Sequence, residues 1–289
     1  MSFARHQTFY LRAGWLAKAI DELSAEVVDY GPFSGNDAPV RLGIGKNMVQ
    51  SLRFWVQATW IAETKSKRLV LTKFGEAVKQ FDPFFEMDLT WWIIHYHLAT
   101  QKEEATSWYY LFNEFPDSEF TRLSFIEGLT NYAEPAASES SYQKDYDCII
   151  ASYVESDSTG SPEDNTDCPL RRLGLLRQQR RQVTRKSSPS IDIPAEVLHL
   201  AIKNTLSVST QNALALNISD LLKARNIGPV FNLSVDAIYR YLDQLQERGW
   251  LRFSRTAGLD SVILEDYDPW VLVDAAYREK GRGVTTVEA

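Results

Sequence analysis

The sequence predicts a mainly α-helical protein with small β wings, in which two winged-helix units flank an aromatic-rich helical middle. Two observations carry this prediction. An amphipathic helix followed by two short strand patterns occurs near both ends of the chain, and aromatic residues are concentrated between them. These patterns divide the 289 residues into five regions. They are an N-terminal winged helix-turn-helix unit (1–80), a helical aromatic-rich middle (81–155), a loop with a basic run (156–190), a second winged-helix-like unit (191–275) and a tail (276–289).

The N-terminal unit is predicted from an opening helix over 14–23, a glycine-rich turn and a second helix. In the second helix, apolar side chains recur at helical spacing and predict one buried face: Met48, Leu52, Trp55 and Val56. The opposite face carries basic and amide side chains: Lys46, Asn47, Gln50, Arg53 and Gln57. Lys and Arg can reach phosphates or guanine, and Gln can pair with adenine. This face therefore predicts a recognition helix for duplex DNA.

A wing is predicted directly after this helix. Two short strand patterns, at 61–63 and 69–72, are separated by a basic turn that contains Lys65, Lys67 and Arg68. Basic side chains at the tip of a wing lie beside the phosphate backbone. The alternative is a surface helix whose Lys, Arg and Gln side chains are only solvated. The basic wing favours DNA contact over that alternative.

Composition sets limits on the class of protein. The net charge of −7 argues against a protein that coats DNA indiscriminately, although it permits a local basic patch. Two isolated cysteines, Cys148 and Cys168, argue for a reducing cytosol and against a disulfide scaffold or a zinc site. The chain has no apolar run long enough to span a membrane and no signal pattern, so we expect a cytoplasmic protein without membrane contact.

Aromatic residues lie close together in the middle region: Trp91, Trp92, Tyr96, Trp108, Tyr109, Tyr110 and Phe112. Aromatic rings can stack on extruded bases, but a cluster this dense favours a buried core.

The same region contains a candidate metal site formed by Asp82, Glu86, Asp88 and His95. Carboxylates with an imidazole can hold Mg²⁺ or Mn²⁺ for phosphodiester cleavage. His97 follows two residues after His95 and would point the other way on one helix. A hydrogen-bonded core histidine is the favoured alternative, and no catalytic residue is assigned.

A second candidate is His6 together with Arg12, which could equally tie the N-terminus to the first helix.

The basic run carries seven positive side chains in the sixteen residues from Arg171 to Lys186. It follows an Asp- and Ser-rich stretch, which predicts a mobile loop. Three of its members, Arg177, Arg180 and Arg181, are our candidates for a phosphate-contacting arm. The alternatives are a solvated linker and a docking site for an acidic partner.

The second winged-helix-like unit contains a helix predicted from a Ser234 N-cap to Glu247, followed by strands at 249–253 and 259–263. The exposed stripe of this helix is mostly acidic: Asp236, Arg240, Asp243 and Glu247. Because DNA would repel it, we expect this unit to contact proteins or to be structural.

Five motifs carry a family resemblance. They lie at 3–18, 42–55, 82–98, 107–113 and 167–175, and include Trp91-Trp92-Ile93-Ile94-His95-Tyr96-His97-Leu98. These segments resemble a domain-of-unknown-function family that includes SspB-like proteins. The resemblance is specific up to about residue 176 and looser beyond it.

The resemblance implies a role in bacterial DNA phosphorothioation, in which sulfur replaces a non-bridging oxygen of the DNA backbone in defence against phage. It also implies partners, namely a sulfurtransferase, a cysteine desulfurase and an ATPase, and an association with DNA nicking. It transfers no catalytic residue to this chain.

Together these observations predict a DNA-binding component of a phosphorothioation system, with nicking of one strand either intrinsic or completed by a partner. Its expected partners are duplex DNA, bound by the first unit, and the sulfurtransferase and ATPase components, docked on the aromatic middle and the last unit. A homodimer is left open. No cofactor is expected unless nicking is intrinsic, in which case Mg²⁺ or Mn²⁺ is required. The main alternative is a transcriptional regulator of the same gene cluster. A scaffold without DNA contact fits the net charge but not the basic helix and wing.

Overall fold

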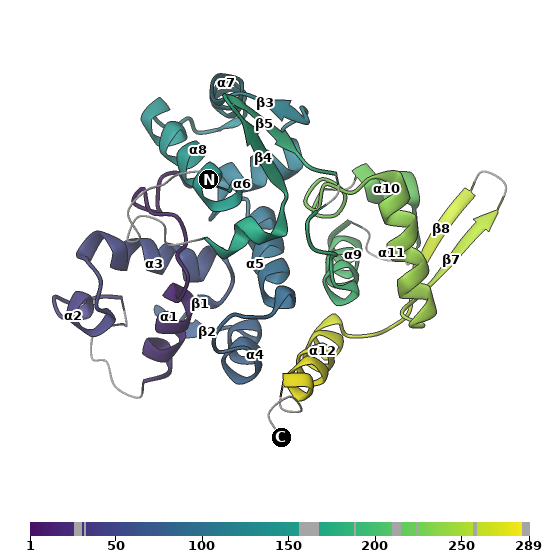
Figure 1. Cartoon of the computed structure of the whole chain (residues 1–289), viewed down its shortest axis with the longest axis horizontal. Coiled ribbons are helices and arrows are strands. Elements are labelled where there is room, and N and C mark those ends of the chain that lie inside the picture. The colour runs from purple at the N-terminus through teal and green to yellow at the C-terminus, as the bar shows by residue number, and fades with distance from the viewer. Residues whose placement is uncertain are drawn as a thin grey trace.

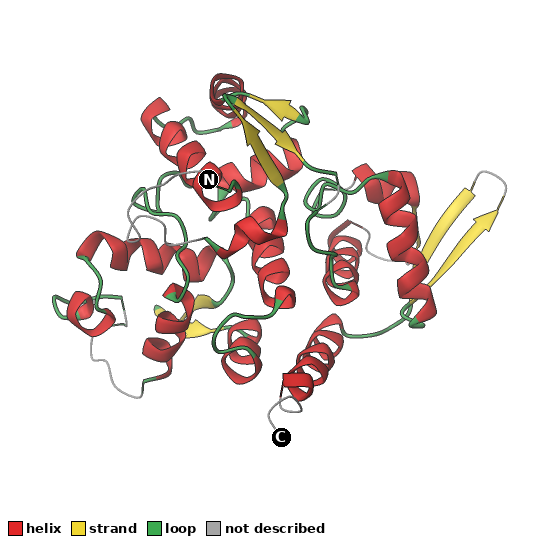
Figure 2. Ribbon diagram, viewed as in Figure 1, coloured by secondary structure: helices red, strands yellow, loops and turns green. Residues whose placement is uncertain are grey.

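The computed structural model describes residues 1–25, 31, 33–155, 168–187, 189–209, 215–223, 225–256 and 259–284. This part of the chain is mainly helical and carries small antiparallel sheets (Figure 2). The predicted fold class is confirmed at this level. The mobile loop was predicted over Ser156–Pro169, and its residues 156–167 lie outside the described residues.

The N-terminal part places three helices before a hairpin and a fourth helix. Its elements are α1 (Trp15–Ser24), α2 (Ala38–Leu42), α3 (Lys46–Ala58), β1 (Ala62–Lys65), β2 (Arg68–Leu71) and α4 (Lys73–Phe81). Helix α3 packs against α1 and α2, and α4 begins at an N-cap where Thr72 Oγ1 accepts from the Gly75 amide at 3.0 Å. A Cβ at Gly75 would lie 2.1 Å from the Ile61 carbonyl oxygen, so only glycine lets α4 pack this closely on the start of the hairpin.

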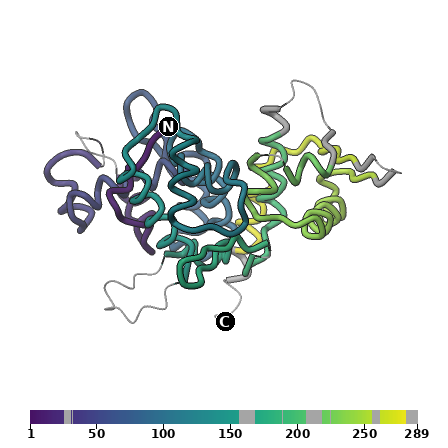
Figure 3. Tube along the Cα trace, turned by 90° about the horizontal axis from the view of Figure 1, so that it is seen from above, coloured from purple at the N-terminus to yellow at the C-terminus, as the bar shows by residue number. Residues whose placement is uncertain are grey.

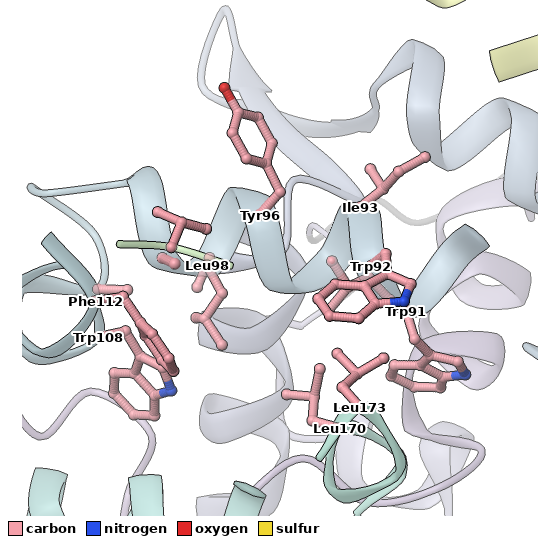
Figure 4. Close-up of a cluster of buried hydrophobic side chains, with 14 of the residues drawn as sticks. Trp91, Trp92, Ile93, Tyr96, Leu98, Trp108, Phe112, Leu170 and Leu173 are labelled. Atoms are coloured by element: carbon pink, nitrogen blue, oxygen red, sulfur yellow. The ribbon is translucent and has the colours of Figure 1, made fainter. Parts of the chain in front are cut away.

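The middle part is built around α5. Its elements are α5 (Asp88–Thr100), α6 (Thr106–Tyr109), the π-helix η1 (Tyr110–Glu114), β3 (Glu119–Phe120), α7 (Arg122–Tyr132) and α8 (Glu139–Tyr153). Every residue of α5 from Leu89 to Ala99 is buried, as expected for a helix that is apolar on all sides. Figure 4 shows its side chains packed with Trp108, Phe112, Leu170 and Leu173. The aromatic cluster is therefore core, and it offers no surface for stacking bases or docking partners.

The basic run forms regular secondary structure, whereas the sequence predicted an arm or a solvated linker. It contains the 3-10 helix η2 (Pro169–Leu173) and a hairpin of β4 (Leu176–Gln179) and β5 (Gln182–Arg185), which joins β3 in a sheet of order β3-β5-β4. Arg185 is drawn inward, where its guanidinium donates to Asn232 Oδ1 at 3.0 Å and to the Pro229 carbonyl at 2.8 Å. Its burial lowers its pKa to about 10. Long-range pairing with β3 stabilises strands whose own sequence is dominated by polar residues.

The C-terminal part contains the predicted helix and strand pair. Its elements are α9 (Ala195–Ser209), β6 (Ala215–Asn217), α10 (Ile218–Lys223), α11 (Val235–Glu247), β7 (Leu251–Thr256), β8 (Leu259–Leu264) and α12 (Pro269–Val284). Its sheet has the order β6-β8-β7. Helix α11 begins where predicted, because Ser234 Oγ accepts from the Ala237 amide at 3.2 Å, and it buries Ile238, Leu242 and Leu245.

Helix α12 is the last described helix, and it packs against the N-terminal part of the protein. It lies beside both α4 and α9 (Figure 1), although residues from 276 onward had been assigned to a tail. Tyr277 stacks on Phe81 with ring centroids 6.0 Å apart, and its hydroxyl lies 2.8 Å from Thr90 Oγ1. The N-terminal helices and the C-terminal unit occupy opposite sides of the molecule when it is seen from above (Figure 3).

Among the described helices, none is long and apolar enough to cross a membrane. Cys148 and Cys168 are buried and are not joined by a disulfide.

Candidate nucleic-acid interface

Helix α3 exposes the side chains that the sequence singled out. Lys46, Asn47, Gln50 and Arg53 are exposed, whereas Leu52, Trp55 and Val56 on the opposite side are buried. Met48 is only half-buried, and Val49 fills the core beside it. Within the described chain neither Lys46 nor Arg53 forms an ion pair. We call Lys46, Asn47, Gln50 and Arg53 the α3 face.

The β1–β2 hairpin continues the α3 face. Its turn is closed by the Lys65–Arg68 register pair, and Ser66 and Lys67 both have positive φ, as in the tight turns that match strand twist. Lys65, Lys67 and Arg68 are exposed, and Lys65 Nζ lies 2.8 Å from Glu63 Oε1. The two elements are joined by a hydrogen bond of 3.3 Å from Gln57 Nε2 to Thr64 Oγ1. Gln57 is half-buried and serves this junction.

A second group of exposed cations lies on the β4–β5 hairpin. Arg177, Arg180 and Arg181 are exposed, with Arg180 at the turn in a positive-φ conformation. Figure 1 shows this hairpin beside α7 and away from α1 and α2. The predicted DNA-contacting residues therefore fall on two separate surfaces, one formed by α3 with the β1–β2 hairpin and one by the β4–β5 hairpin.

Asp82, the first member of the candidate metal site, is buried and holds the turn that leads into α5. Its Oδ1 accepts from the Glu86 amide at 2.8 Å, and its Oδ2 accepts from the Met87 amide at 3.1 Å and from Thr90 Oγ1 at 2.5 Å. Burial raises the pKa of Asp82. Both carboxylate oxygens already accept hydrogen bonds from the protein, which leaves little coordination capacity for a cation.

The other three members of the candidate set have separate surroundings. Glu86 is exposed and Asp88 forms an ion pair with Arg172. His95 is buried, with Nδ1 2.8 Å from Tyr153 Oη and Nε2 2.9 Å from the Val230 carbonyl, and its burial lowers its pKa to about 4. The described residues contain no group of three or more His, Cys, Asp or Glu side chains that could hold a metal ion. The set does not fit Mg²⁺ or Mn²⁺.

His6 forms part of a buried network that the sequence did not reveal. Its Nε2 lies 2.8 Å from Asp145 Oδ1, and Asp145 also accepts from the Ala4 amide at 2.8 Å and from Ser107 Oγ at 2.6 Å. The Arg12 guanidinium lies over the rings of Phe9, Tyr10 and Trp15. Both side chains hold the N-terminal segment in place. This is the structural role that the sequence offered as the alternative to a catalytic one. Asp145 and Ser107 have no local sequence signal, because they lie more than a hundred residues from His6.

Helix α11 presents an acidic surface. Asp236, Asp243 and Glu247 are exposed, and Arg240 Nη2 lies 3.6 Å from Asp192 Oδ1. The same face, with Tyr239 and Gln244, borders a hollow of about 620 Å³. Its sign is opposite to that of the α3 face.

The fold and these surfaces define a mainly helical protein with a basic helix-and-hairpin face at one end and an acidic helix at the other. The chain belongs to the DUF4007 family, described as proteins of unknown function, whose model matches residues 3–277.

Two solved structures are similar over nearly the whole chain. A magnesium ion-bound SspB crystal structure has a TM-score of 0.84 and 27% sequence identity, and the match covers 99% of this chain and 89% of that one. An SspB crystal structure has a TM-score of 0.83 and 26% identity, with the same coverage. None of the curated proteins matches. The resemblance to an SspB-like family of unknown function is thus confirmed.

Proposed function

We propose that this chain is the DNA-binding component of a bacterial DNA phosphorothioation system that acts in defence against phage. The observation that carries the proposal is the exposed α3 face, which is continued by the basic β1–β2 hairpin. The similarity to SspB supports its assignment to such a system.

In this proposal the α1–α4 region acts as a winged helix. Helix α3 enters the major groove, where Lys46 and Arg53 contact guanine or phosphate and Asn47 and Gln50 contact adenine. Basic side chains of the β1–β2 hairpin rest on the neighbouring phosphates. The support is the order of the elements, three helices followed by a hairpin, and the absence of an ion pair at Lys46 and Arg53 among the described residues.

The partners are assigned to the other end of the molecule. The acidic face of α11 suits a basic protein surface and repels DNA, so we assign it to the sulfurtransferase or ATPase components. A net charge of −7 favours a protein that binds DNA weakly alone and is held there by cytosolic partners.

Nicking of one strand to assist modification is the finer part of the proposal. The likeness to a magnesium-bound SspB is the reason to test Mg²⁺, although Asp82, Glu86, Asp88 and His95 do not form a site for it. We therefore assign DNA binding to the α3 face and the β1–β2 hairpin, and we assign no residue to nicking.

The test uses purified protein in gel-shift titrations with duplexes of several sequences, and with supercoiled plasmid with and without Mg²⁺. Salt-dependent binding of many duplexes supports the modification role. Tight, symmetric binding of a single operator would instead identify a transcriptional regulator, and no binding of any duplex would refute the proposal. Conversion of the plasmid to open circles only with Mg²⁺ would show intrinsic nicking.

A further inference from the structure

We propose that a groove beside the β4–β5 hairpin binds one unpaired strand of DNA. The proposal rests on the proposed function because it takes DNA as the polymer, but it assigns a different surface and a different form of DNA. The groove comprises two adjoining hollows of about 760 and 680 Å³. Both are bordered by Arg171, Gln178 and Arg180, so the two hollows adjoin at the hairpin.

Among the described residues that line it, the groove has an excess of positive charge. Its cations are Arg122, Arg171, Arg177, Arg180, Arg181 and Lys186, and its acids are Asp147 and Glu155. Arg122 pairs with Asp147 at 2.9 Å, and Arg171 donates to the Ala151 carbonyl at 2.9 and 2.8 Å.

Three of these cations, Arg177, Arg180 and Arg181, are exposed and have no ion pair within the described part of the chain. Arg181 borders the first hollow, Arg177 the second and Arg180 both. Guanidinium groups spread over the groove in this way match the repeated phosphates of a polynucleotide.

One wall of the groove is apolar. Leu123, at the start of α7, is 66% exposed, and Ile150 of α8 and Val154 directly after that helix lie along the same hollow. The Arg122 guanidinium covers the ring of Tyr146 at 5.8 Å. Bases of a single strand pack on apolar surfaces and on guanidinium planes, in addition to the phosphate contacts.

The size and chemistry of the groove favour a single strand over a duplex. Hollows of this size match a ligand of nucleotide dimensions. A duplex keeps its bases stacked inside and could offer only phosphates, which leaves the apolar wall unused. An unpaired strand offers a phosphate and a base at every nucleotide, and so matches the cations and the apolar wall together.

The experiment compares a labelled oligothymidylate with a labelled duplex of the same length, by fluorescence anisotropy at several salt concentrations. The groove variant carries Arg177→Gln, Arg180→Gln and Arg181→Gln. A second variant, Leu123→Ser, removes the exposed apolar contact without changing charge. The α3 variant carries Lys46→Gln and Arg53→Gln. The control, Lys79→Gln with Lys280→Gln, removes two exposed charges outside both surfaces.

We expect the groove variant to bind the oligothymidylate at least about tenfold more weakly, with a shallower salt dependence, while its duplex affinity stays near that of the wild type. Leu123→Ser should weaken oligothymidylate binding without changing its salt dependence. The α3 variant should lose duplex affinity and keep its affinity for the oligothymidylate. Single-strand binding by the groove variant at the wild-type level, or no more impaired than in the control, would overturn the proposal. Loss of an acidic partner protein without loss of single-strand binding would overturn it in favour of protein docking. A wild type that binds the oligothymidylate but no duplex would refute the proposed function and leave the groove standing.

Discussion

His6 Nε2 and Asp145 Oδ1 lie 2.8 Å apart inside the protein, although 139 positions separate them in the sequence. Asp145 lies on α8, and Ser107 on α6 donates to its other oxygen at 2.6 Å. The contact therefore fixes the segment before α1 against the aromatic core. Because α1 packs on α3, this network also sets where the α3 face is presented.

Asp145→Ala tests this role. The substitution leaves His6, Ser107 and the Ala4 amide without their shared acceptor. We expect the free energy of unfolding to fall by about 1–3 kcal/mol for each buried donor left unsatisfied, measured in denaturant titrations. The matched control is Asp147→Ala on the same helix, which removes an exposed ion pair with Arg122 and changes stability little. Equal losses in the two variants would refute a structural role for the network.

Asp82→Ala distinguishes an acceptor that holds a turn from a metal ligand. Asp82 satisfies the Glu86 and Met87 amides just before α5, so we expect its loss to lower the free energy of unfolding by about 1–3 kcal/mol. Mg²⁺ should have the same effect on the thermal midpoint of wild type and variant in differential scanning calorimetry. Stabilisation of the wild type alone by Mg²⁺ would restore Asp82 as a ligand.

Acid should destabilise the protein through its buried histidines. Burial lowers the pKa of His97 to about 3 and those of His95 and His199 to about 4, from an ordinary value of 6.5. Because the unfolded chain binds these protons more readily, the stability from the neutral rings is complete above pH 6.5 and is lost as the pH falls toward 4 and 3. Each ring contributes about 1.4 kcal/mol per pH unit within its window.

His97→Phe isolates one of these rings. Its centroid lies 4.5 Å from that of Trp60, and among the described residues its Nε2 has no hydrogen-bond partner, so a phenyl ring keeps the packing. We expect a shallower dependence of unfolding free energy on pH between 6.5 and 4 than in the wild type. The raised pKa of Asp82 acts in the opposite direction but is common to both proteins and cancels. Parallel curves would contradict this assignment.

Local patterns predicted the elements that local chemistry determines. The Ser234 cap and the apolar spacing of α11 were visible in the sequence, as were the exposed and buried sides of α3. Elements that depend on residues far away in the sequence were not predicted. The β4–β5 hairpin is polar and needs β3 as a partner, and the helical residues after 276 are held by the contact of Tyr277 with Phe81.

The candidate site divides in the same way. Exposure of the α3 face follows from helical periodicity and was predictable. The candidate metal set relied on closeness in sequence, but Asp82 holds the turn before α5 whereas His95 reaches Tyr153 and Val230 in the core. Which oxygen or nitrogen each side chain meets is decided by tertiary packing, and one sequence carries no signal for that.

Lys46→Ala and Arg53→Ala test the α3 face as a duplex-binding surface. Both side chains are exposed on a helix whose opposite side is buried, so truncation should leave the fold intact, with circular dichroism as the check. We expect each lost contact to cost about 1–3 kcal/mol of duplex affinity. A residue that contacts phosphate should also reduce the steepness of the salt dependence in gel-shift titrations, whereas one that contacts a base should change sequence preference. Lys79→Ala on α4 serves as the control for loss of an exposed charge. Unchanged affinity and an unchanged salt slope in both variants would exclude the α3 face and leave its cations as solvated surface residues.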